Sequence, residues 1–148
     1  MESANAPIHR QVEAALAEHD VRYTAGRRAV VAALCEADGP LSVAELTDAM
    51  DNSVPTSSVY RTIAVFEDAG VVSHHLATRE MARYELAEWL RGHHHHLVCI
   101  DCGRVDDIAV ADNLEEDVER VVDLIASGAS FKATNHALEI EGRCLECA

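Results

Sequence analysis

The stretch His93-His-His-His-Leu-Val-Cys-Ile-Asp-Cys-Gly103 concentrates the chemistry of this chain. It joins four consecutive histidines to a Cys-x-x-Cys pair, and 41 residues separate that pair from a second one, Cys144-Leu-Glu-Cys147. Two residues between paired cysteines let a tight turn aim both thiolates at one ion, and two such turns complete the tetrahedron that zinc prefers. The spacing therefore predicts a structural Zn²⁺ site made of Cys99, Cys102, Cys144 and Cys147.

The histidine run leads directly into the apolar residues of a predicted strand, His96 to Ile100. Alternation along a strand sends His93 and His95 to one side and His94 and His96 to the other. Four adjacent histidines can in this way serve two metal sites. The alternatives are an exposed polar loop or a purification tag, and the internal position of the run argues against a tag.

The charge of the chain is strongly acidic, with 26 Asp and Glu against 12 Lys and Arg and a net charge of −14. Residues 1–87 carry 7 basic and 13 acidic residues, a net charge of −6, and residues 88–148 carry 5 and 13, a net charge of −8. A generally basic, nucleic-acid-coating surface is therefore excluded. Any contact with DNA has to rest on a few placed arginines and on bound cations.

The apolar and cysteine patterns indicate the compartment. No apolar run approaches the roughly 20 residues of a membrane span, and the N-terminus has no signal-peptide core. Four of the five cysteines form two close pairs, which suits thiolate–metal binding in a reducing compartment better than a disulfide framework. We expect a cytoplasmic protein with no membrane partner.

The first 87 residues are predicted to form a winged helix-turn-helix domain. Helical periodicity covers residues 8–20, 25–37, 43–50 and 58–69, and two strands of a hairpin follow over 71–76 and 82–87. Thr24 is the predicted N-cap of the second helix, Ser42 and Glu45 form a capping box on the third, and Thr56 or Ser57 opens the fourth. Helices followed by a two-stranded wing are typical of this DNA-binding fold.

The helix that begins near Thr56 would lie in the major groove of DNA. Hydroxyls and an arginine in its first turn can reach phosphates and base edges, and the helix dipole favours the phosphate. Tyr60 as a packing residue and Arg61 as a solvated charge are the alternatives, but their position at the helix start favours DNA contact. The predicted DNA-binding residues are Arg22, Thr56, Ser57, Ser58, Tyr60 and Arg61.

The rest of the chain is predicted as a hinge over 88–92 and a metal-binding dimerisation domain over 93–148. Strands are expected over 96–100, 105–110 and 131–141, with a helix from Leu114 to about Ala126 capped by Asn113. A unit of about 55 residues is small for independent stability, so metal binding or pairing with a second copy would have to supply what its core lacks. The expected fold class is α+β.

Together these motifs resemble the ferric uptake regulator superfamily of bacterial metal-dependent repressors, along essentially the whole chain. The matching pieces are Arg22-Tyr-Thr24 with Arg28, Pro55-Thr-Ser-Ser-Val-Tyr-Arg-Thr62, Tyr84-Glu-Leu86, the stretch His93 to Gly103, Thr134-Asn-His136 and Gly142-Arg-Cys-Leu-Glu-Cys147. The resemblance implies a homodimer that binds operator DNA when a divalent metal occupies a hinge site, and that controls metal homeostasis genes.

The resemblance also implies which residues hold metal. The four cysteines match a structural zinc site. Glu85, His94 and His96 match a hinge sensory site, and the second site in the dimerisation domain is matched by His93, His95, Glu115 and His136; many relatives have Asp at the position of His95.

The match departs from iron and peroxide sensors at Pro40, where they offer a histidine to the hinge site. Zinc-sensing relatives take a ligand from the start of the wing and often a Cys near its end. This chain has His74 and His75 at the start of the wing but Glu85 near its end, so either histidine is a candidate hinge ligand. Imidazole and carboxylate ligands suit Zn²⁺ and Fe²⁺ about equally, so both stay open as the regulatory metal.

Two other functions are alternatives to the repressor. A peroxide sensor on the same fold would oxidise a ligand histidine of bound iron. A zinc hydrolase or deaminase needs an open coordination position and an H-x-E motif with a P-C-x-x-C partner, neither of which occurs in the sequence. The chain is therefore predicted not to be an enzyme.

Overall fold

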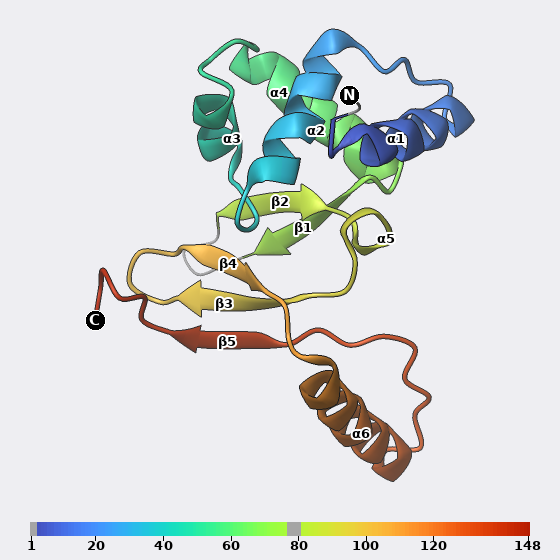
Figure 1. The fold of residues 1–148 in the computed structure, drawn as a ribbon, viewed down its shortest axis with the longest axis vertical. Coiled ribbons are helices and arrows are strands. Elements are labelled where there is room, and N and C mark those ends of the chain that lie inside the picture. Colours follow the sequence, from blue (N-terminus) through green and yellow to red (C-terminus); the bar gives the residue numbers. More distant parts are fainter. Residues whose placement is uncertain (1–2, 77–80) are drawn as a thin grey trace. The chain divides into compact units, whose positions relative to one another are not determined.

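The computed structural model describes residues 3–76 and 81–148, which fall into two compact units, Met1–His93 and His94–Ala148. Each unit is described by itself. Figure 1 shows helices and a two-stranded sheet in the first unit and a three-stranded sheet with one long helix in the second. The α+β class predicted from the sequence is confirmed. Within the described residues, no helix has both the length and the apolar character needed to cross a membrane.

The first unit contains helices α1 (Ala6–Glu18), α2 (Ala25–Glu36), α3 (Val43–Ala49) and α4 (Thr56–Asp68). The predicted cap of α2 is confirmed, because Arg27 N donates to Thr24 Oγ1 at 3.4 Å. The prediction that Thr56 or Ser57 opens α4 is confirmed for Thr56. The N-cap of this helix is Pro55, without a side-chain hydrogen bond. The φ angle that proline fixes suits this position, so no polar side chain is required to begin the helix.

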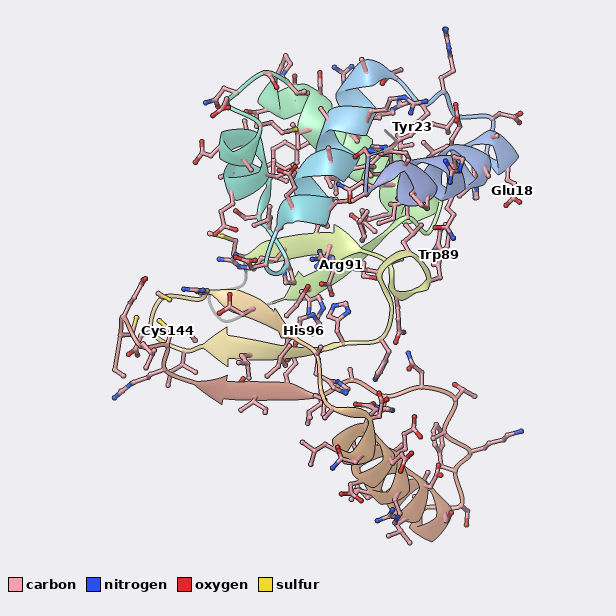
Figure 2. All side chains as sticks on the ribbon, viewed as in Figure 1. Glu18, Tyr23, Trp89, Arg91, His96 and Cys144 are labelled. Atoms are coloured by element: carbon pink, nitrogen blue, oxygen red, sulfur yellow. The ribbon has the colours of Figure 1, made fainter. Side chains whose placement is uncertain are left out.

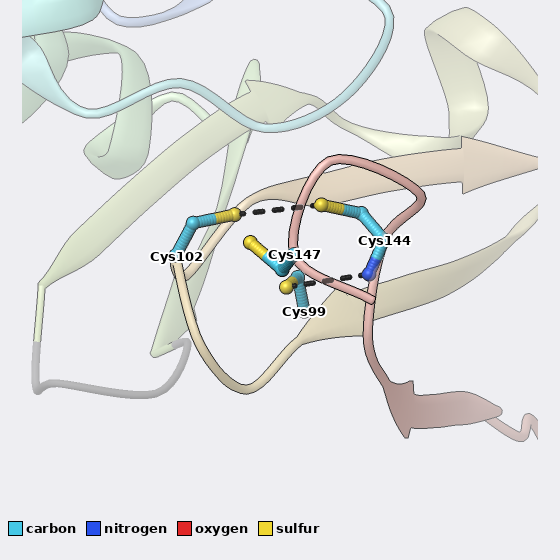
Figure 3. A group of neighbouring side chains, drawn as sticks. All are labelled: Cys99, Cys102, Cys144 and Cys147. Carbon is cyan, nitrogen blue, oxygen red and sulfur yellow. Dashed lines mark hydrogen bonds between the residues drawn. The ribbon is translucent and has the colours of Figure 1, made fainter.

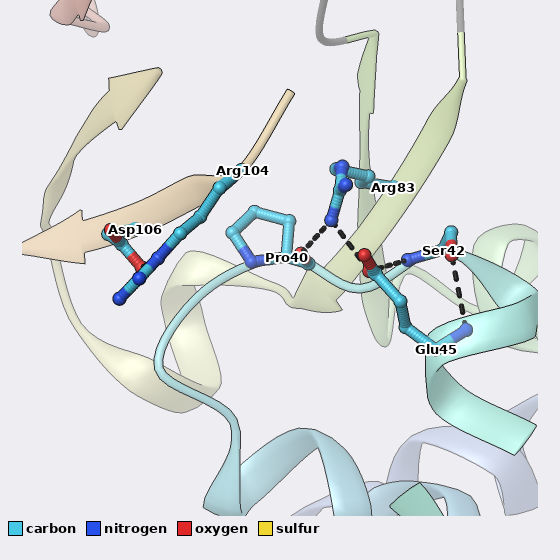
Figure 4. A network of polar contacts seen from close by, with 6 residues as sticks. All are labelled: Pro40, Ser42, Glu45, Arg83, Arg104 and Asp106. Carbon is cyan, nitrogen blue, oxygen red and sulfur yellow. Dashed lines mark hydrogen bonds and ion pairs between the residues drawn. The ribbon is translucent and has the colours of Figure 1, made fainter. Parts of the chain in front are cut away.

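The predicted capping box at the start of α3 is confirmed, and its carboxylate also contacts the wing (Figure 4). Glu45 N donates to Ser42 Oγ at 3.2 Å, and Ser42 N donates to Glu45 Oε2 at 2.9 Å. The same Glu45 oxygen accepts from Arg83 Nη1 at 2.6 Å, and Arg83 also donates to the carbonyl of Pro40. One carboxylate therefore joins the start of α3 to the wing.

The apolar core of the first unit is continuous through all four helices and the wing. The predicted inner stripe of α4, Val59, Ile63 and Phe66, is buried. It belongs to one cluster with residues of the other elements: Val12, Leu16, Val30, Val31, Leu34, Leu46, Val71, Leu86 and Leu90. This packing fixes the exposed face of α4 relative to the rest of the unit.

The wing is an antiparallel pair of β1 (Val72–Leu76) and β2 (Ala82–Leu86). Leu41 adds a short bridge to it, because its N–H and carbonyl exchange hydrogen bonds of 2.9 and 2.8 Å with Tyr84. Both predicted strands are thus present, each one residue shorter than expected.

The residues predicted as a hinge contain a helical turn, α5 (Glu88–Arg91), that is fixed to the first unit (Figure 2). Arg91 donates to the carbonyls of Leu34 and Ala37 at 3.0 and 2.7 Å, at the end of α2. Trp89 Nε1 donates to the carbonyl of Gly70 at 2.8 Å. The last carbonyls of a helix have no intrahelical partners, and Arg91 donates hydrogen bonds to two carbonyls at the end of α2.

The second unit contains β3 (His95–Cys99), β4 (Val105–Ile108), α6 (Asp112–Gly128) and β5 (Glu139–Gly142). The strand order is β4-β3-β5, antiparallel between β3 and β4 and parallel between β3 and β5. Parallel pairing requires a long crossover, which α6 provides.

The start of the helix and the last strand of the second unit differ most from the predictions. The cap predicted at Asn113 is wrong, because α6 begins at Asp112 after Ala111 and Asn113 lies in its first turn. The strand predicted over 131–141 is confined to Glu139–Gly142. The alternating residues before it form a loop, since alternation alone does not provide a neighbouring strand for pairing.

Candidate metal centres and nucleic-acid interface

Four cysteine sulfurs gather at one end of the second unit (Figure 3). Cys99 ends β3, and the pair of Cys144 and Cys147 follows β5, which lies beside β3 in a register that pairs Cys99 with Gly142. The first turn closes through a hydrogen bond from Gly103 N to Cys99 O, with Gly103 at φ 77°. The four ligand atoms all lie within 4.8 Å of one another, so the structure brings together the cysteines predicted from the sequence.

The surroundings of the cysteine cluster shift the pKa values of Cys99 and Cys147 in opposite directions. Backbone N–H groups of Cys102 and Cys144 lower the pKa of the Cys99 thiol to about 6. The hydrogen bond with the Cys144 thiol and burial raise the pKa of Cys147 to about 12. The Cys99 sulfur is thus favoured as a thiolate, whereas deprotonation of the neighbouring Cys147 thiol is opposed. A bound Zn²⁺ would reverse that opposition, and four sulfur ligands would leave it no open position for catalysis.

A second cluster in the second unit joins three elements. His95 of β3 is 2% exposed, and its Nε2 lies 2.7 Å from Glu115 Oε2. His136, in the loop before β5, places Nε2 2.7 Å from the other oxygen of Glu115. The two rings stack with centroids 5.3 Å apart. Three of the four residues predicted for this site therefore meet around one carboxylate.

A third cluster lies on the opposite side of β3. Asp107 Oδ1 of β4 lies 3.5 Å from His94 Nε2 and 3.3 Å from His96 Nε2. His96 is the direct register partner of Asp107. The predicted alternation of the histidine run is thus found, with His95 toward Glu115 and His94 and His96 toward Asp107. Asp107 was not among the ligands predicted from the sequence, although the adjacent carboxylates of Asp106 and Asp107 in the predicted strand over 105–110 could have indicated it.

The wing of the first unit places a histidine beside a buried carboxylate. His75 Nε2 lies 3.1 Å from Glu85 Oε1, and Glu85 is 4% exposed. His74 is directed elsewhere, 3.9 Å from Glu67 and edge-on to the ring of Tyr84. Adjacent strand residues face opposite sides, so only His75 shares the side of Glu85. His93, the last residue of this unit, contacts the carboxylate of Glu88.

The predicted DNA-contact residues lie at the surface of the first unit. Tyr60 is 60% exposed, and Thr56, Ser57 and Arg61 are also exposed on the first turns of α4. Ser58 is half-buried and accepts from Arg61 Nη2 at 3.4 Å. Arg22 is exposed in the loop before α2. α4 thus presents hydroxyls, an aromatic ring and a cation from the end of the helix where its dipole is positive.

Comparison with known proteins places this geometry in a family. Residues 18–141 match the model of the ferric uptake regulator family. A ferric uptake regulation protein of Legionella pneumophila is 40% identical over 94 residues, 64% of this chain and 64% of that protein, so the match spans less than two thirds of that relative's length.

Solved structures agree with the fold. The Vibrio cholerae ferric uptake regulator superposes with a TM-score of 0.69 at 29% identity, covering 89% of this chain and 98% of that one. A zinc-bound manganese uptake regulator superposes with a TM-score of 0.70 at 29% identity, covering 90% and 98%. The chain therefore belongs to the ferric uptake regulator family, whose members are metal-dependent transcription regulators and not enzymes.

Proposed function

We propose that this protein is a transcriptional repressor that binds operator DNA as a homodimer when a divalent ion occupies a hinge site. The cluster of His94, His96 and Asp107 carries the proposal, because His94 directly follows His93, the last residue of the first unit. Two imidazoles and a carboxylate form an incomplete first shell for Zn²⁺ or Fe²⁺. The remaining ligands have to come from elsewhere in the protein.

The wing pair, Glu85 and His75, supplies those ligands in the proposal. It has the same chemistry, an imidazole beside a carboxylate within 3.1 Å, and it lies on the one unit that carries α4. An ion that takes ligands from both units binds most tightly in one arrangement of the two. Its occupancy then shifts the population toward that arrangement, in which both copies of α4 fit successive major grooves.

Bound metal would also reduce the negative charge of the protein. At a net charge of −14, the protein and DNA repel each other. Each divalent ion that neutralises carboxylates such as Asp107 and Glu85 reduces that repulsion. Metal would thus favour DNA binding in two ways, by selecting one arrangement of the two units and by reducing the repulsion between protein and DNA.

The second cluster, His95, Glu115 and His136, is proposed as a further divalent-metal site with His93 as its fourth ligand. His93 lies two residues before His95 along the chain, on the same side under strand alternation. The site would fasten the first turn of α6 to β3, and Zn²⁺ in the four-cysteine site would fasten β3 to the chain end.

A second copy of the chain is the proposed partner of the second unit. α6 leaves large apolar side chains in solvent, among them Leu124 and Ile125 at 68% exposure each, and β5 forms an edge of the sheet with Ile140 exposed. Exposed apolar faces of this kind mark interaction sites, and an edge strand offers unpaired backbone groups. Pairing these surfaces in a symmetric dimer would bury both.

The test is metal-titrated DNA binding, measured by fluorescence anisotropy with Zn²⁺, Fe²⁺, Mn²⁺ and Ni²⁺ side by side, on protein that retains its structural zinc. We expect affinity for operator duplex to rise steeply with one or more of these ions and to fall on brief chelation with EDTA. Equal affinity of chelated and metal-loaded protein would reject the proposal. Light scattering in the same buffers reports the dimer.

A further inference from the structure

A groove of about 420 Å³ lies in the first unit where the N-terminal ends of α2 and α4 come together. It is lined mainly by the starts of the two helices: Thr24, Gly26, Arg27, Pro55, Ser58 and Arg61. None of its described lining residues is acidic, in a chain with more than twice as many acidic as basic residues. The groove is thus a local concentration of positive charge on an acidic protein.

The two arginines of the groove differ from other arginines of this unit. Arg83 pairs with Glu45, and Arg28 pairs with Glu13 at 3.2 Å. Arg27 instead donates to the carbonyl of Arg22 at 2.6 Å, and Arg61 to the hydroxyl of Ser58. In residues 3–76 and 81–148, neither of these two forms an ion pair with a carboxylate.

Contacts with neutral oxygens position Arg27 and Arg61 without neutralising them. Each guanidinium has five N–H donors, of which the described hydrogen bonds use few. Both arginines line one groove, so their positive charges add there. The pair is therefore suited to an anionic ligand.

The backbone adds donors to the same groove. α2 and α4 have 12 and 13 residues, and both direct their N-terminal ends to it. The start of α4 has no side-chain cap, because Pro55 occupies that position. Its first N–H groups thus remain available, and the dipoles of both helices favour a negative charge at this point.

We propose that the groove binds one backbone phosphate of double-stranded DNA, held by Arg27 together with Arg61. The inference rests on the proposed DNA-binding function and adds a contact from α2, which the sequence did not predict. The planar guanidinium matches two phosphate oxygens at once. A phosphate held at the start of α4 fixes the register of that helix, so that Tyr60 and the exposed hydroxyls read bases from a set position.

The experiment measures binding of metal-loaded protein to operator and scrambled duplexes over a range of salt concentrations. Arg27→Gln is expected to weaken binding to both duplexes by the same factor, roughly tenfold or more. The slope of log affinity against log salt should fall by about one, the signature of one lost phosphate contact. Arg120→Gln, which removes the same charge from a 68% exposed side chain of α6, should leave both quantities unchanged.

Two further variants separate phosphate binding from a structural effect of Arg27 on the loop of Arg22. Arg27→Lys keeps the charge and loses the planar fork, so it should retain the wild-type salt slope with intermediate affinity. The double variant Arg27→Gln/Arg61→Gln should lose less than the sum of the single losses, because both side chains hold one phosphate. Thermal unfolding of each variant shows whether the unit is intact.

A wild-type salt slope in Arg27→Gln, or strictly additive losses in the double variant, would overturn the phosphate site while leaving the repressor intact. Failure of the wild-type protein to bind any duplex with any metal would instead reject the proposed function. Calorimetry with inorganic phosphate tests the other source of the same anion. Phosphate binding that Arg27→Gln removes, without any change in DNA affinity, would also reject the DNA assignment.

Discussion

The two units maintain their folds by different means. The first buries one continuous apolar cluster, which includes Leu16, Leu34 and Phe66. In the second, the buried apolar residues of the described chain are Val98, Cys99, Val105 and Ala126, and two further buried residues are His95 and His96. Half of that set is made of metal-ligand types. Apolar packing thus specifies the first fold, whereas the second unit buries too few apolar residues for this, so we expect bound ions and a partner surface to stabilise it.

Removal of the structural zinc should have the largest effect and should be confined to the second unit. Cys99→Ser breaks the four-sulfur set, and structural zinc contributes on the order of 10 kcal/mol to the folding of small metal domains. We expect zinc loss by elemental analysis and collapse of NMR dispersion for residues 94–148 alone. Cys35→Ser is the matched control, since this cysteine lies in the first unit apart from the cluster. Equal damage from both substitutions would contradict the comparison.

Truncation of the apolar core should break the first unit in turn. Phe66→Ala removes a fully buried ring and should cost about 3–5 kcal/mol of unfolding free energy. Zinc content and the signals of the second unit should be retained. Tyr60→Ala, on the exposed face of the same helix, should stay within about 0.5 kcal/mol in denaturant unfolding. Loss of zinc on Phe66→Ala would show that the two folds are not independent.

Substitution of Asp107 should separate regulation from folding. Asp107→Asn removes the carboxylate beside His94 and His96, so we expect metal affinity at the hinge site to fall by roughly 10–100-fold. Structural zinc and metal-free stability should be unchanged. His74→Ala provides the control, because His74 faces away from Glu85. Metal titrations followed by DNA binding measure both, and a larger loss for His74→Ala would reassign the wing ligand to that residue.

The smallest expected effect is a pH dependence inside the first unit. Burial and then the charge of Arg28 lower the pKa of His9, whose Nδ1 lies 2.5 Å from the Tyr23 hydroxyl. Burial raises the pKa of Tyr23, so the hydroxyl stays a donor to neutral His9. A lowered folded-state pKa means that this contribution is complete above pH 6.5 and is lost as pH falls below it.

His9→Gln keeps a hydrogen-bonding side chain and removes the titration. Its stability, measured by urea unfolding at pH 7.5 and 5.5, should therefore decline less than that of the wild type on acidification. His19→Gln on the exposed side of the same helix should behave like the wild type. A steeper decline in His9→Gln than in the wild type would refute the assignment.

Local sequence signals predicted much of the fold. The caps at Thr24 and Ser42 and the inner stripe of α4 were read correctly, because capping and helical periodicity depend on residues a few positions apart. The cap predicted at Asn113 was wrong, because α6 begins after Ala111 without any side-chain cap. The length of the last strand also escaped prediction, because a strand extends only as far as its neighbour pairs with it.

The types of ligand and their spacing can be read from the residues alone, since the chemistry of thiolates and imidazoles is a property of the side chains. This information predicted the four-cysteine cluster and the two sides of the histidine run. The folded chain was needed to show that Asp107 faces His94 and His96, that His75 rather than His74 faces Glu85, and that Arg27 shares a groove with Arg61. These choices depend on strand register and helix packing, which bring together side chains far apart in the chain.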